Sequence, residues 1–287
     1  VDPTRETNAS LSRLMIGAEP PKLVHRPRMD GPVALEVRSL SLPQMDPFGM
    51  TLREVSLTLR GGELLGIAGV SGNGQQELMA ALSGEDTRPA PGSVQLFGED
   101  ISDLPPDARR RKGLHFVPEE RLGRGAVPSM SLAANTLLTR TESVIRGTIR
   151  TLKVRALAER LIARFDVKSG GPGAPARSLS GGNLQKFLVG REIDAQPRVL
   201  IVSQPTWGVD VGAAALIRAE LLALRDQGAA VLVVSEELDE LFELCDRMVV
   251  IAQGRVSPSI ATAEATVEQI GEWMSGLWVR EGQDAAA

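Results

Sequence analysis

Residues 179–186 read Leu-Ser-Gly-Gly-Asn-Leu-Gln-Lys, and this run constrains the fold of the chain more than any other stretch. Gly181 and Gly182 leave backbone N–H groups uncovered, and Ser180 places a hydroxyl beside them. A helix that begins here would direct the positive end of its dipole towards an anion. The run therefore predicts a helix start that meets a phosphate or another anion.

A second anion-binding pattern lies earlier in the chain. A turn and a buried strand over residues 61–69 lead into the G-x-x-x-x-G spacing of a P-loop, from Gly69 to Gly74. Gln75 stands where this pattern has Lys, and Gln76 stands where it has Ser or Thr. Two neutral amides supply neither a point charge nor a hydroxyl ligand for Mg²⁺, so we expect a loop that still cradles a phosphate but binds nucleotide weakly. An ordinary strand, turn and helix with glycine punctuation is the alternative. The predicted loop residues are Gly69, Val70, Ser71, Gly72, Asn73, Gly74, Gln75 and Gln76.

Two later apolar runs, rich in β-branched residues, predict strands that are buried on both faces. The first, residues 198–202, is followed by Ser203-Gln204-Pro205-Thr206. The second, residues 231–235, is followed by Glu236. We expect chemistry at the tips of such strands, which makes Ser203, Gln204 and Glu236 candidate site residues.

In their order along the chain, these blocks resemble ATP-binding cassette (ABC) transporter ATPases. That family uses its LSGG signature to hold the γ-phosphate of an ATP bound mainly by a second cassette, so the resemblance implies that this chain is half of a pair. Residues 205–210, Pro-Thr-Trp-Gly-Val-Asp, match the family's P-T-x-G-x-D block. This match implies that Asp210 is the D-loop residue that reaches across the pair. The resemblance assigns to the signature Leu179, Ser180, Gly181, Gly182, Asn183 and Gln185.

The same resemblance implies a hydrolytic site without its charged groups. In an ordinary ABC ATPase the first buried strand is followed by an Asp that holds Mg²⁺ through water and a Glu that polarises the attacking water. Here Ser203 and Gln204 take those places, and Glu236 takes the place of the switch His that senses the γ-phosphate. With Gln75 and Gln76, these substitutions imply ATP as the cofactor, weak or absent Mg²⁺, no intact metal site, and doubtful hydrolysis by this domain alone.

Residues 116–121, Phe-Val-Pro-Glu-Glu-Arg, stand at the Q-loop position. They are similar to the V-P-E-[DE]-R block of tandem-cassette ATPases that import simple sugars and nucleosides. The substitution of the P-loop Lys by Gln75 also resembles the second cassette of such proteins. The resemblance implies the N-terminal cassette of the same protein and membrane permease subunits as partners, and indirectly a periplasmic or lipoprotein solute-binding protein. It also implies a peripheral location on the cytoplasmic face of the membrane, with Glu119, Glu120 and Arg121 at the coupling surface.

The implied fold class is α/β: a P-loop ABC cassette with a mixed central sheet, a small antiparallel β subdomain and a helical subdomain. Alternating apolar residues predict half-exposed antiparallel strands over 35–40 and 55–59, and residues 248–256 predict a hairpin. From Leu132 to Asp194 the pattern turns helical. The expected apolar positions of this helical region include Leu152, Ala156, Ala158, Leu161 and Ile162. The expected segments are 1–32 (end of a preceding cassette and linker), 33–125 (core with the degenerate P-loop), 126–178 (helical subdomain), 179–276 (signature helix and remaining core) and 277–287 (flexible tail).

Phe48 lies where the family often has an aromatic residue that stacks on adenine. Packing of this ring against its neighbours is the alternative, because an aromatic residue before a turn commonly fills space.

Composition and charge exclude several other classes of protein. A net charge of −4 gives no indication of a nucleic-acid partner, and the basic cluster at residues 109–112 predicts a solvated helix end. No apolar run approaches the roughly 18 residues of a membrane-spanning helix. Cys245 has no second thiol to pair with and is expected to fill the core.

Two alternative functions stay open. The first is a regulatory or structural module that binds nucleotide without hydrolysis and serves as a dimerisation platform. The second is a soluble ABC ATPase of translation or repair, although those proteins generally keep Lys and Glu in both cassettes.

Overall fold

The computed structural model describes residues 31–140, 144–145 and 148–278. It divides into two compact units. The helical unit comprises residues 118–195 and 205–223, and the sheet unit comprises residues 31–117, 196–204 and 224–278. The predicted end of a preceding cassette before residue 31, and most of the predicted tail, lie outside the described residues.

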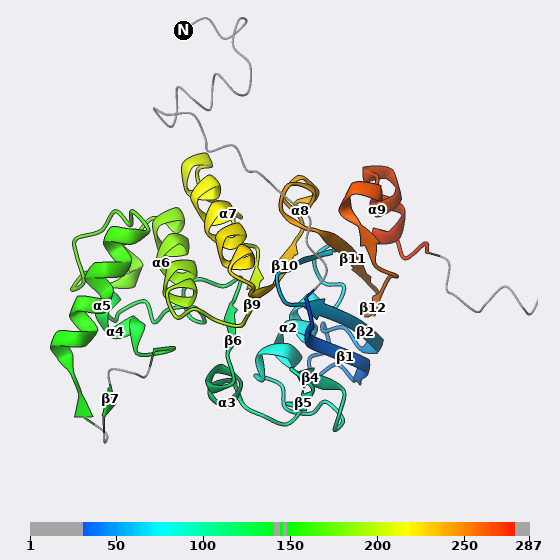
Figure 1. Cartoon of the computed structure of the whole chain (residues 1–287), viewed down its shortest axis with the longest axis horizontal. Coiled ribbons are helices and arrows are strands. Elements are labelled where there is room, and N and C mark those ends of the chain that lie inside the picture. Colours follow the sequence, from blue (N-terminus) through cyan, green and yellow to red (C-terminus); the bar gives the residue numbers. More distant parts are fainter. Residues whose placement is uncertain (1–30, 141–143, 146–147, 279–287) are drawn as a thin grey trace, which may run out of the picture. The chain divides into compact units, whose positions relative to one another are not determined.

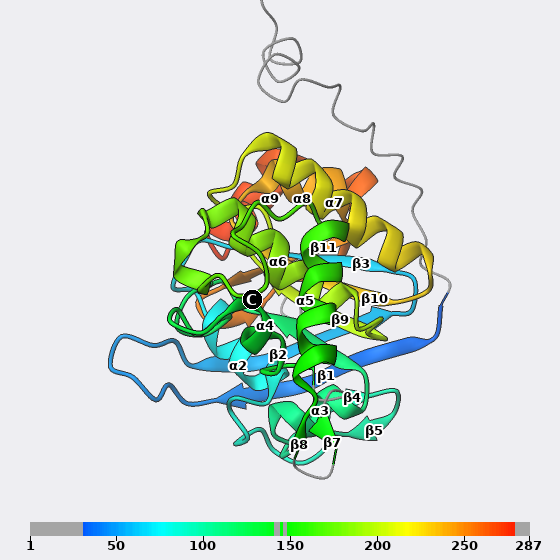
Figure 2. The same cartoon turned by 90° about the vertical axis from the view of Figure 1, so that its left-hand side faces the viewer.

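Among the described residues, a mixed seven-stranded sheet forms the centre of the sheet unit (Figures 1 and 2). Its order is β12-β11-β3-β10-β9-β6, and β13 pairs with β11. The strands β11, β3, β10, β9 and β6 run parallel to one another, whereas β12 and β13 run antiparallel to β11. Every residue of β3, β9 and β10 is buried, which explains why the sequence shows continuous apolar runs there. The strands are β3 (Leu64–Ala68), β6 (Leu114–Val117), β9 (Val199–Ser203), β10 (Ala230–Ser235), β11 (Arg247–Ala252), β12 (Arg255–Val256) and β13 (Ile260–Ala261).

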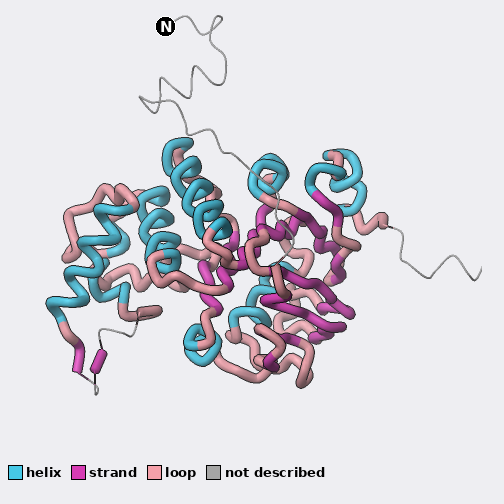
Figure 3. The backbone as a smooth tube through the Cα atoms, viewed as in Figure 1, coloured by secondary structure: helices cyan, strands magenta, loops and turns pink. Residues whose placement is uncertain are grey.

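The remaining described strands of the sheet unit form a four-stranded antiparallel sheet of order β2-β1-β4-β5. Figure 3 shows the strands of this unit in magenta. The predicted antiparallel pair is confirmed, because β1 (Val33–Leu42) pairs with β2 (Leu52–Arg60) and buried residues alternate with more exposed ones along both strands. The shorter strands are β4 (Val94–Leu96) and β5 (Glu99–Asp100). Apolar side chains from both sheets and from the helix α2 form one core.

The predicted hairpin near residue 250 is also confirmed. Ile251 pairs with Val256 and Ala252 with Arg255, and a two-residue turn joins the strands. Gln253 and Gly254 in this turn have φ values of 51° and 73°, as a tight hairpin turn requires.

The prediction of a solvated helix end at residues 109–112 is wrong in part. Arg109 is completely buried, and its guanidinium donates to the carbonyl oxygens of Ala81 and Leu82 at 2.6 and 2.8 Å. Burial lowers the pKa of Arg109 to about 10, so the group remains charged at neutral pH. Arg111 and Lys112 are exposed, as expected. The short helices described in the sheet unit are α2 (Gln75–Ser83), α3 (Pro106–Arg111), α8 (Leu238–Leu244) and α9 (Val267–Met274).

The helical unit contains α4, α5 and α6, with a short β7–β8 hairpin between the first two (Figure 1). The predicted apolar face of α5 is wrong in part, because Leu152 is 82% exposed and Ala156 is exposed, whereas Val154 and Leu157 are buried. No helix in the described ranges is long and apolar enough to cross a membrane. The elements are α4 (Leu132–Thr136), β7 (Val144–Ile145), β8 (Thr148–Ile149), α5 (Thr151–Arg164), η2 (Ala176–Ser178), α6 (Gly181–Ile193) and α7 (Val211–Asp226), the last of which continues into the sheet unit.

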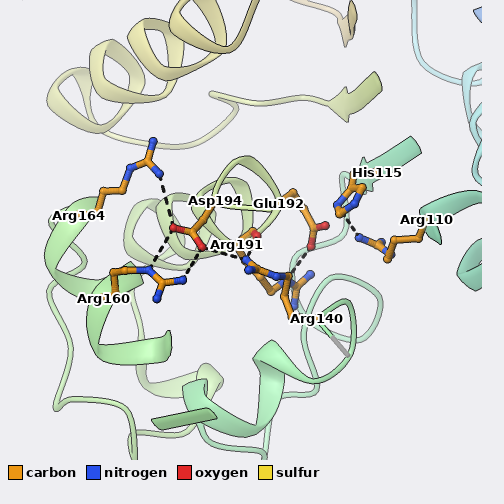
Figure 4. A network of polar contacts seen from close by, with 8 residues as sticks. All are labelled: Arg110, His115, Arg140, Arg160, Arg164, Arg191, Glu192 and Asp194. Carbon is orange, nitrogen blue, oxygen red and sulfur yellow. Dashed lines mark hydrogen bonds and ion pairs between the residues drawn. The ribbon is translucent and has the colours of Figure 1, made fainter. Parts of the chain in front are cut away.

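An arginine cluster surrounds Asp194 at the carboxyl end of α6 (Figure 4). Arg140 and Arg160 bind its carboxylate at 3.0 and 2.8 Å, and Arg164 lies at 3.5 Å. Burial disfavours the charged form, but the hydrogen bonds from Arg160 and Arg140 outweigh it and lower the pKa of Asp194. The cluster joins α5 and the segment after α4 to the end of the signature helix.

Candidate functional site

The phosphate loop lies between β3 and α2 in the sheet unit. Gly74, directly before α2, has a φ of 112°, a conformation that favours glycine. The turn between β11 and β12 braces the loop: the Gly254 N–H donates to the Asn73 carbonyl at 2.9 Å, and the Gln253 N–H donates to Asn73 Oδ1 at 2.8 Å. The chain's own hydrogen bonds therefore hold the loop in shape.

The side chain of Gln75 folds back across this loop. Its Oε1 accepts the Asn73 N–H at 3.0 Å, and its Nε2 donates to the Val70 carbonyl at 2.9 Å. In a P-loop such backbone N–H groups bind phosphate oxygens. Here an amide oxygen of the chain itself engages the Asn73 N–H, at the position where the pattern has a charged lysine. The other side chains of the loop, those of Val70, Ser71 and Gln76, are exposed, as is Gly72.

Ser203, Gln204 and Glu236 lie at the same edge of the main sheet as the phosphate loop, because β3, β9 and β10 are neighbouring parallel strands. Gln204 has a φ of 49° and donates its N–H to the Val234 carbonyl at 2.7 Å. Its Oε1 accepts the Glu236 N–H at 3.4 Å. Ser203 and Gln204 are buried, whereas Glu236 is exposed. The structure thus brings these three predicted residues together with the loop in one unit.

Phe48 lies in the segment that joins β1 to β2. This segment is attached to α2 through the Met50 N–H, which donates to Glu77 Oε1 at 2.7 Å. The Phe48 side chain is 98% exposed, so the alternative, that this ring packs against its neighbours, is wrong. Adenine stacking by Phe48 stays a prediction.

The signature lies at the start of α6 in the helical unit. Ser180 precedes the helix in an extended conformation, with a ψ of 157°, and its side chain does not cap the first turn. Its Oγ instead accepts a hydrogen bond from Asn183 Nδ2 at 2.9 Å, and Asn183 Oδ1 accepts the Lys168 N–H at 2.8 Å. Ser180 and Gly181 are exposed. The signature therefore presents a hydroxyl beside helix N–H groups that its own serine leaves uncapped.

Asp210 lies directly before α7 and caps it, because its Oδ1 accepts the Ala213 N–H at 2.8 Å. Its Oδ2 would lie 3.3 Å from a Cβ added at Gly182. The predicted D-loop residue and a signature glycine are therefore neighbours in the helical unit, and a side chain at position 182 would press on the carboxylate.

Arg121 turns towards the signature, a role that its sequence context did not indicate. Its Nε donates to Gln185 Oε1 at 3.1 Å, and its Nη2 donates to the Trp207 carbonyl. The guanidinium also lies 5.8 Å from the Trp207 ring centre, and burial lowers the pKa of Arg121. Glu119 and Glu120 are exposed. Arg121 thus joins the Q-loop segment to the signature helix and to the residues before Asp210.

Of the three predicted residues at this sheet edge, Glu236 carries a carboxylate, whereas Ser203 and Gln204 are neutral. In the part of the chain that the structure describes, no cluster of three or more His, Cys, Asp or Glu side chains is arranged to hold a metal ion.

Comparison with curated proteins finds import ATP-binding proteins. The chain is 36% identical over 280 residues to the nucleoside import ATP-binding protein NupA of Lactococcus lactis, covering 96% of this chain and 55% of that protein. It is 36% identical over 287 residues to the guanosine import ATP-binding protein NupO of Bacillus subtilis, covering 98% of this chain and 56% of that protein. A glucose import ATP-binding protein of Haloferax volcanii is 38% identical over 288 residues, covering 98% and 51%. The chain spans about half the length of the curated relatives it matches.

Solved structures show the same fold. The dimeric structure of the bacterial ABC transporter cassette MJ0796 has a TM-score of 0.68 at 20% identity, covering 79% of this chain and 98% of that one. An ATP-binding subunit of an ABC transporter has a TM-score of 0.67 at 18% identity, covering 84% and 99%. These similarities confirm the predicted P-loop ABC cassette with its mixed sheet, antiparallel β subdomain and helices. Residues 52–207, more than half of the chain, match the family model described as ABC transporter. The chain belongs to the ABC transporter family, as an ATPase domain homologous to sugar and nucleoside import ATP-binding proteins.

Proposed function

We propose that this chain is the second cassette of a tandem-cassette ABC importer ATPase. In this proposal its signature completes the ATP site of the N-terminal cassette, and its own phosphate loop forms a degenerate second site. ABC transporter ATPase domains bind ATP and Mg²⁺ and hydrolyse ATP as a family. The named relatives are import ATP-binding proteins for a nucleoside, guanosine and glucose, so we assign a nucleoside or simple sugar as the solute and membrane permease subunits as partners.

The observation that carries this proposal is the contrast between the two anion-binding elements. Ser180 leaves the first turn of α6 without a side-chain cap, so this turn is ready to meet an anion. Gln75, by contrast, occupies the Asn73 N–H of the phosphate loop. The signature is therefore suited to bind a phosphate that another cassette holds, and the loop is poorly suited to hold one itself.

The residues at the sheet edge also fit Mg²⁺ poorly. Mg²⁺ prefers carboxylate, phosphate and water oxygens in octahedral geometry. Ser203 and Gln204 offer neutral oxygens, and the Gln204 Oε1 already accepts the Glu236 N–H. We therefore assign weak or absent Mg²⁺ binding to this cassette's own site.

Glu119 and Glu120 are proposed to meet the permease, because their side chains are exposed next to the anchored Arg121. This surface would lie on the cytoplasmic face of the membrane, where the permease subunits present their inner ends. The solute-binding protein would act on the other side and reach this chain only through the permease.

The test is equilibrium binding of ATP to this chain, with and without Mg²⁺, alongside its hydrolysis rate. The wild type is expected to bind weakly, with little response to Mg²⁺ and no turnover. Gln75→Ala frees the Asn73 N–H from a bond with a net contribution of about 1 kcal/mol, so ATP should bind roughly five-fold more tightly. Gln75→Lys should tighten binding further, because an ammonium adds charge beside the phosphates.

Gln227→Ala, which changes an exposed glutamine directly after α7, is the matched control and should leave ATP affinity unchanged. Tight Mg²⁺-dependent binding with turnover by the wild type would overturn the degenerate site. Equal ATP affinity of the wild type and Gln75→Ala would show that the Gln75 contact does not compete with phosphate.

A non-hydrolytic regulatory or dimerisation module is the second candidate, and the self-supported phosphate loop favours it. A loop that keeps its shape through Gln75 and the Gln253–Gly254 turn needs no nucleotide to stay ordered. Ser180→Ala in the full-length protein separates the two functions. Loss of ATP hydrolysis supports the importer cassette, and unchanged turnover supports the regulatory module.

A further inference from the structure

The orientation of the Asn183 amide follows from one backbone contact. Side-chain amides can be placed either way round, and the hydrogen-bond network decides between the two orientations. The Lys168 backbone N–H can only donate, so the amide atom 2.8 Å away must be Oδ1. The opposite end of the amide, which lies 2.9 Å from Ser180 Oγ, must then be the donor Nδ2.

This orientation fixes the role of the Ser180 hydroxyl. A hydroxyl has one proton to donate and two lone pairs that accept. Asn183 Nδ2 occupies one lone pair, and an amide NH₂ cannot accept the hydroxyl proton. Within the described residues the Ser180 side chain has no other hydrogen-bond partner, and it is exposed. The proton is thus available to an acceptor outside the described chain, whether solvent water or a ligand.

We propose that Asn183 is a positioning residue that sets Ser180 as a hydrogen-bond donor. The ligand class this selects is an acceptor-only anion, such as the terminal phosphate of a nucleotide held by the paired cassette. The backbone N–H of Lys168 fixes the orientation of the Asn183 side-chain amide, because it donates to Oδ1 and so leaves Nδ2 facing Ser180. This inference rests on the proposed function, in which the signature meets a nucleotide bound elsewhere.

The test is a double-mutant cycle on ATP hydrolysis by the full-length protein, with Ser180→Ala, Asn183→Ala and both together. Ser180→Ala should lower kcat/KM roughly 10- to 100-fold, the range for a hydrogen bond to a charged group. Asn183→Ala should lower it roughly three- to ten-fold, because the hydroxyl loses its orientation but keeps its proton. In the Ser180→Ala background, Asn183→Ala should change kcat/KM less than about two-fold, since coupled residues are not additive.

Asn183→Asp provides an opposite perturbation. An aspartate still accepts the Lys168 N–H, but its second oxygen now accepts the Ser180 proton and reverses the hydroxyl. This variant should be slower than Asn183→Ala when Ser180 is present. If Asn183→Asp still lowers kcat/KM in the Ser180→Ala background, that remaining loss is due to charge repulsion between the aspartate and the nucleotide. Ser180→Thr keeps the hydroxyl and should restore both the rate and its dependence on Asn183, which a general structural defect would not do.

The outcomes separate the inference from the proposed function. If Ser180→Ala lowers turnover but Asn183→Ala has no effect, or the same effect in both backgrounds, the positioning role is wrong and the proposed function stands. If Ser180→Ala leaves turnover unchanged, both are wrong. Thermal unfolding midpoints of all variants show that each rate belongs to a folded protein.

Discussion

Asp194 offers the clearest test of what stabilises the signature helix. Asp194→Ala removes the carboxylate that binds Arg140, and both side chains are nearly buried, at 8% and 10% exposure. Breaking a buried ion pair costs about 3–5 kcal/mol, because an uncompensated charge remains. Arg140 keeps a hydrogen bond to the Arg191 carbonyl at 3.3 Å, which reduces this cost. Arg160 and Arg164 are 56% and 43% exposed, so their pairs add little. We expect a loss of about 2–4 kcal/mol in the free energy of unfolding.

Urea unfolding measures this loss, with Trp207 fluorescence reporting on the helical unit after Trp273 and Trp278 are replaced by Phe. Glu159→Ala is the matched control, because it breaks the exposed Arg155–Glu159 pair on the neighbouring α5. The control should cost about 0.3–0.5 kcal/mol. A loss for Asp194→Ala no larger than that of the control would refute the reasoning.

The same residue predicts a pH dependence. Because the folded pKa of Asp194 is lowered from 3.8, its contribution to stability is fully present above that pH. The contribution declines as the pH falls below 3.8 towards the folded pKa. The difference in unfolding free energy between the wild type and Asp194→Asn should therefore shrink in that range. A difference that stays constant down to full protonation would contradict the lowered pKa.

Two further substitutions and one chemical modification have expected outcomes. Arg121→Met removes the contacts to Gln185 and to Trp207, so Trp207 fluorescence should shift and stability should fall by about 1–2 kcal/mol; an unchanged spectrum would contradict the contact. Burial raises the pKa of the Cys245 thiol well above its ordinary value, so a thiol reagent at pH 8 should react at the rate of unfolding, and fast reaction of the native protein would disprove the burial. Gly254→Ala would place a Cβ 1.9 Å from the Thr51 carbonyl oxygen at a φ of 73°, and urea unfolding should show a loss of about 2–4 kcal/mol; a wild-type midpoint would mean that the turn relaxes freely.

The central strands could be predicted from sequence because burial on both faces leaves a continuous apolar run. Residues 199–203 and 230–235 show this pattern, and both form buried strands. The hairpin near residue 250 was predictable because Gln253 and Gly254 end the apolar strand β11 with a tight two-residue turn.

The two failures in the fold have different physical causes, and the cause at Arg109 is contact between residues distant in sequence. Arg109 belongs to a charged cluster, yet it is buried because carbonyl groups at the end of α2 converge on its guanidinium. For Leu152, which is exposed, the wrong face of α5 was chosen, because the buried residues are those spaced at i, i+3, i+4 and i+7, namely Val154, Leu157, Ala158 and Leu161. No local pattern encodes the burial of Arg109, whereas helical spacing does encode the buried face of α5.

Within the candidate site, residue identities were predictable but side-chain directions were not. The loss of a charged P-loop residue at Gln75 was evident from spacing, whereas its contact with the Asn73 N–H depends on the shape of the folded loop. Arg121 was assigned to a partner surface, and its contact with Gln185 depends on the return of the signature helix from later in the chain.

The strand order has a consequence for how the chain is made. β3 ends at Ala68, but both of its neighbours, β10 and β11, begin only at Ala230 and Arg247. At about 5–20 residues per second, a ribosome needs on the order of 10–30 s to extend the chain that far. During that interval a wholly apolar strand emerges with both edges unpaired, while the contiguous stretch 118–195 is already complete. Both edges of this strand therefore stay unpaired until β10 and β11, in about the last fifth of the chain, have been synthesised.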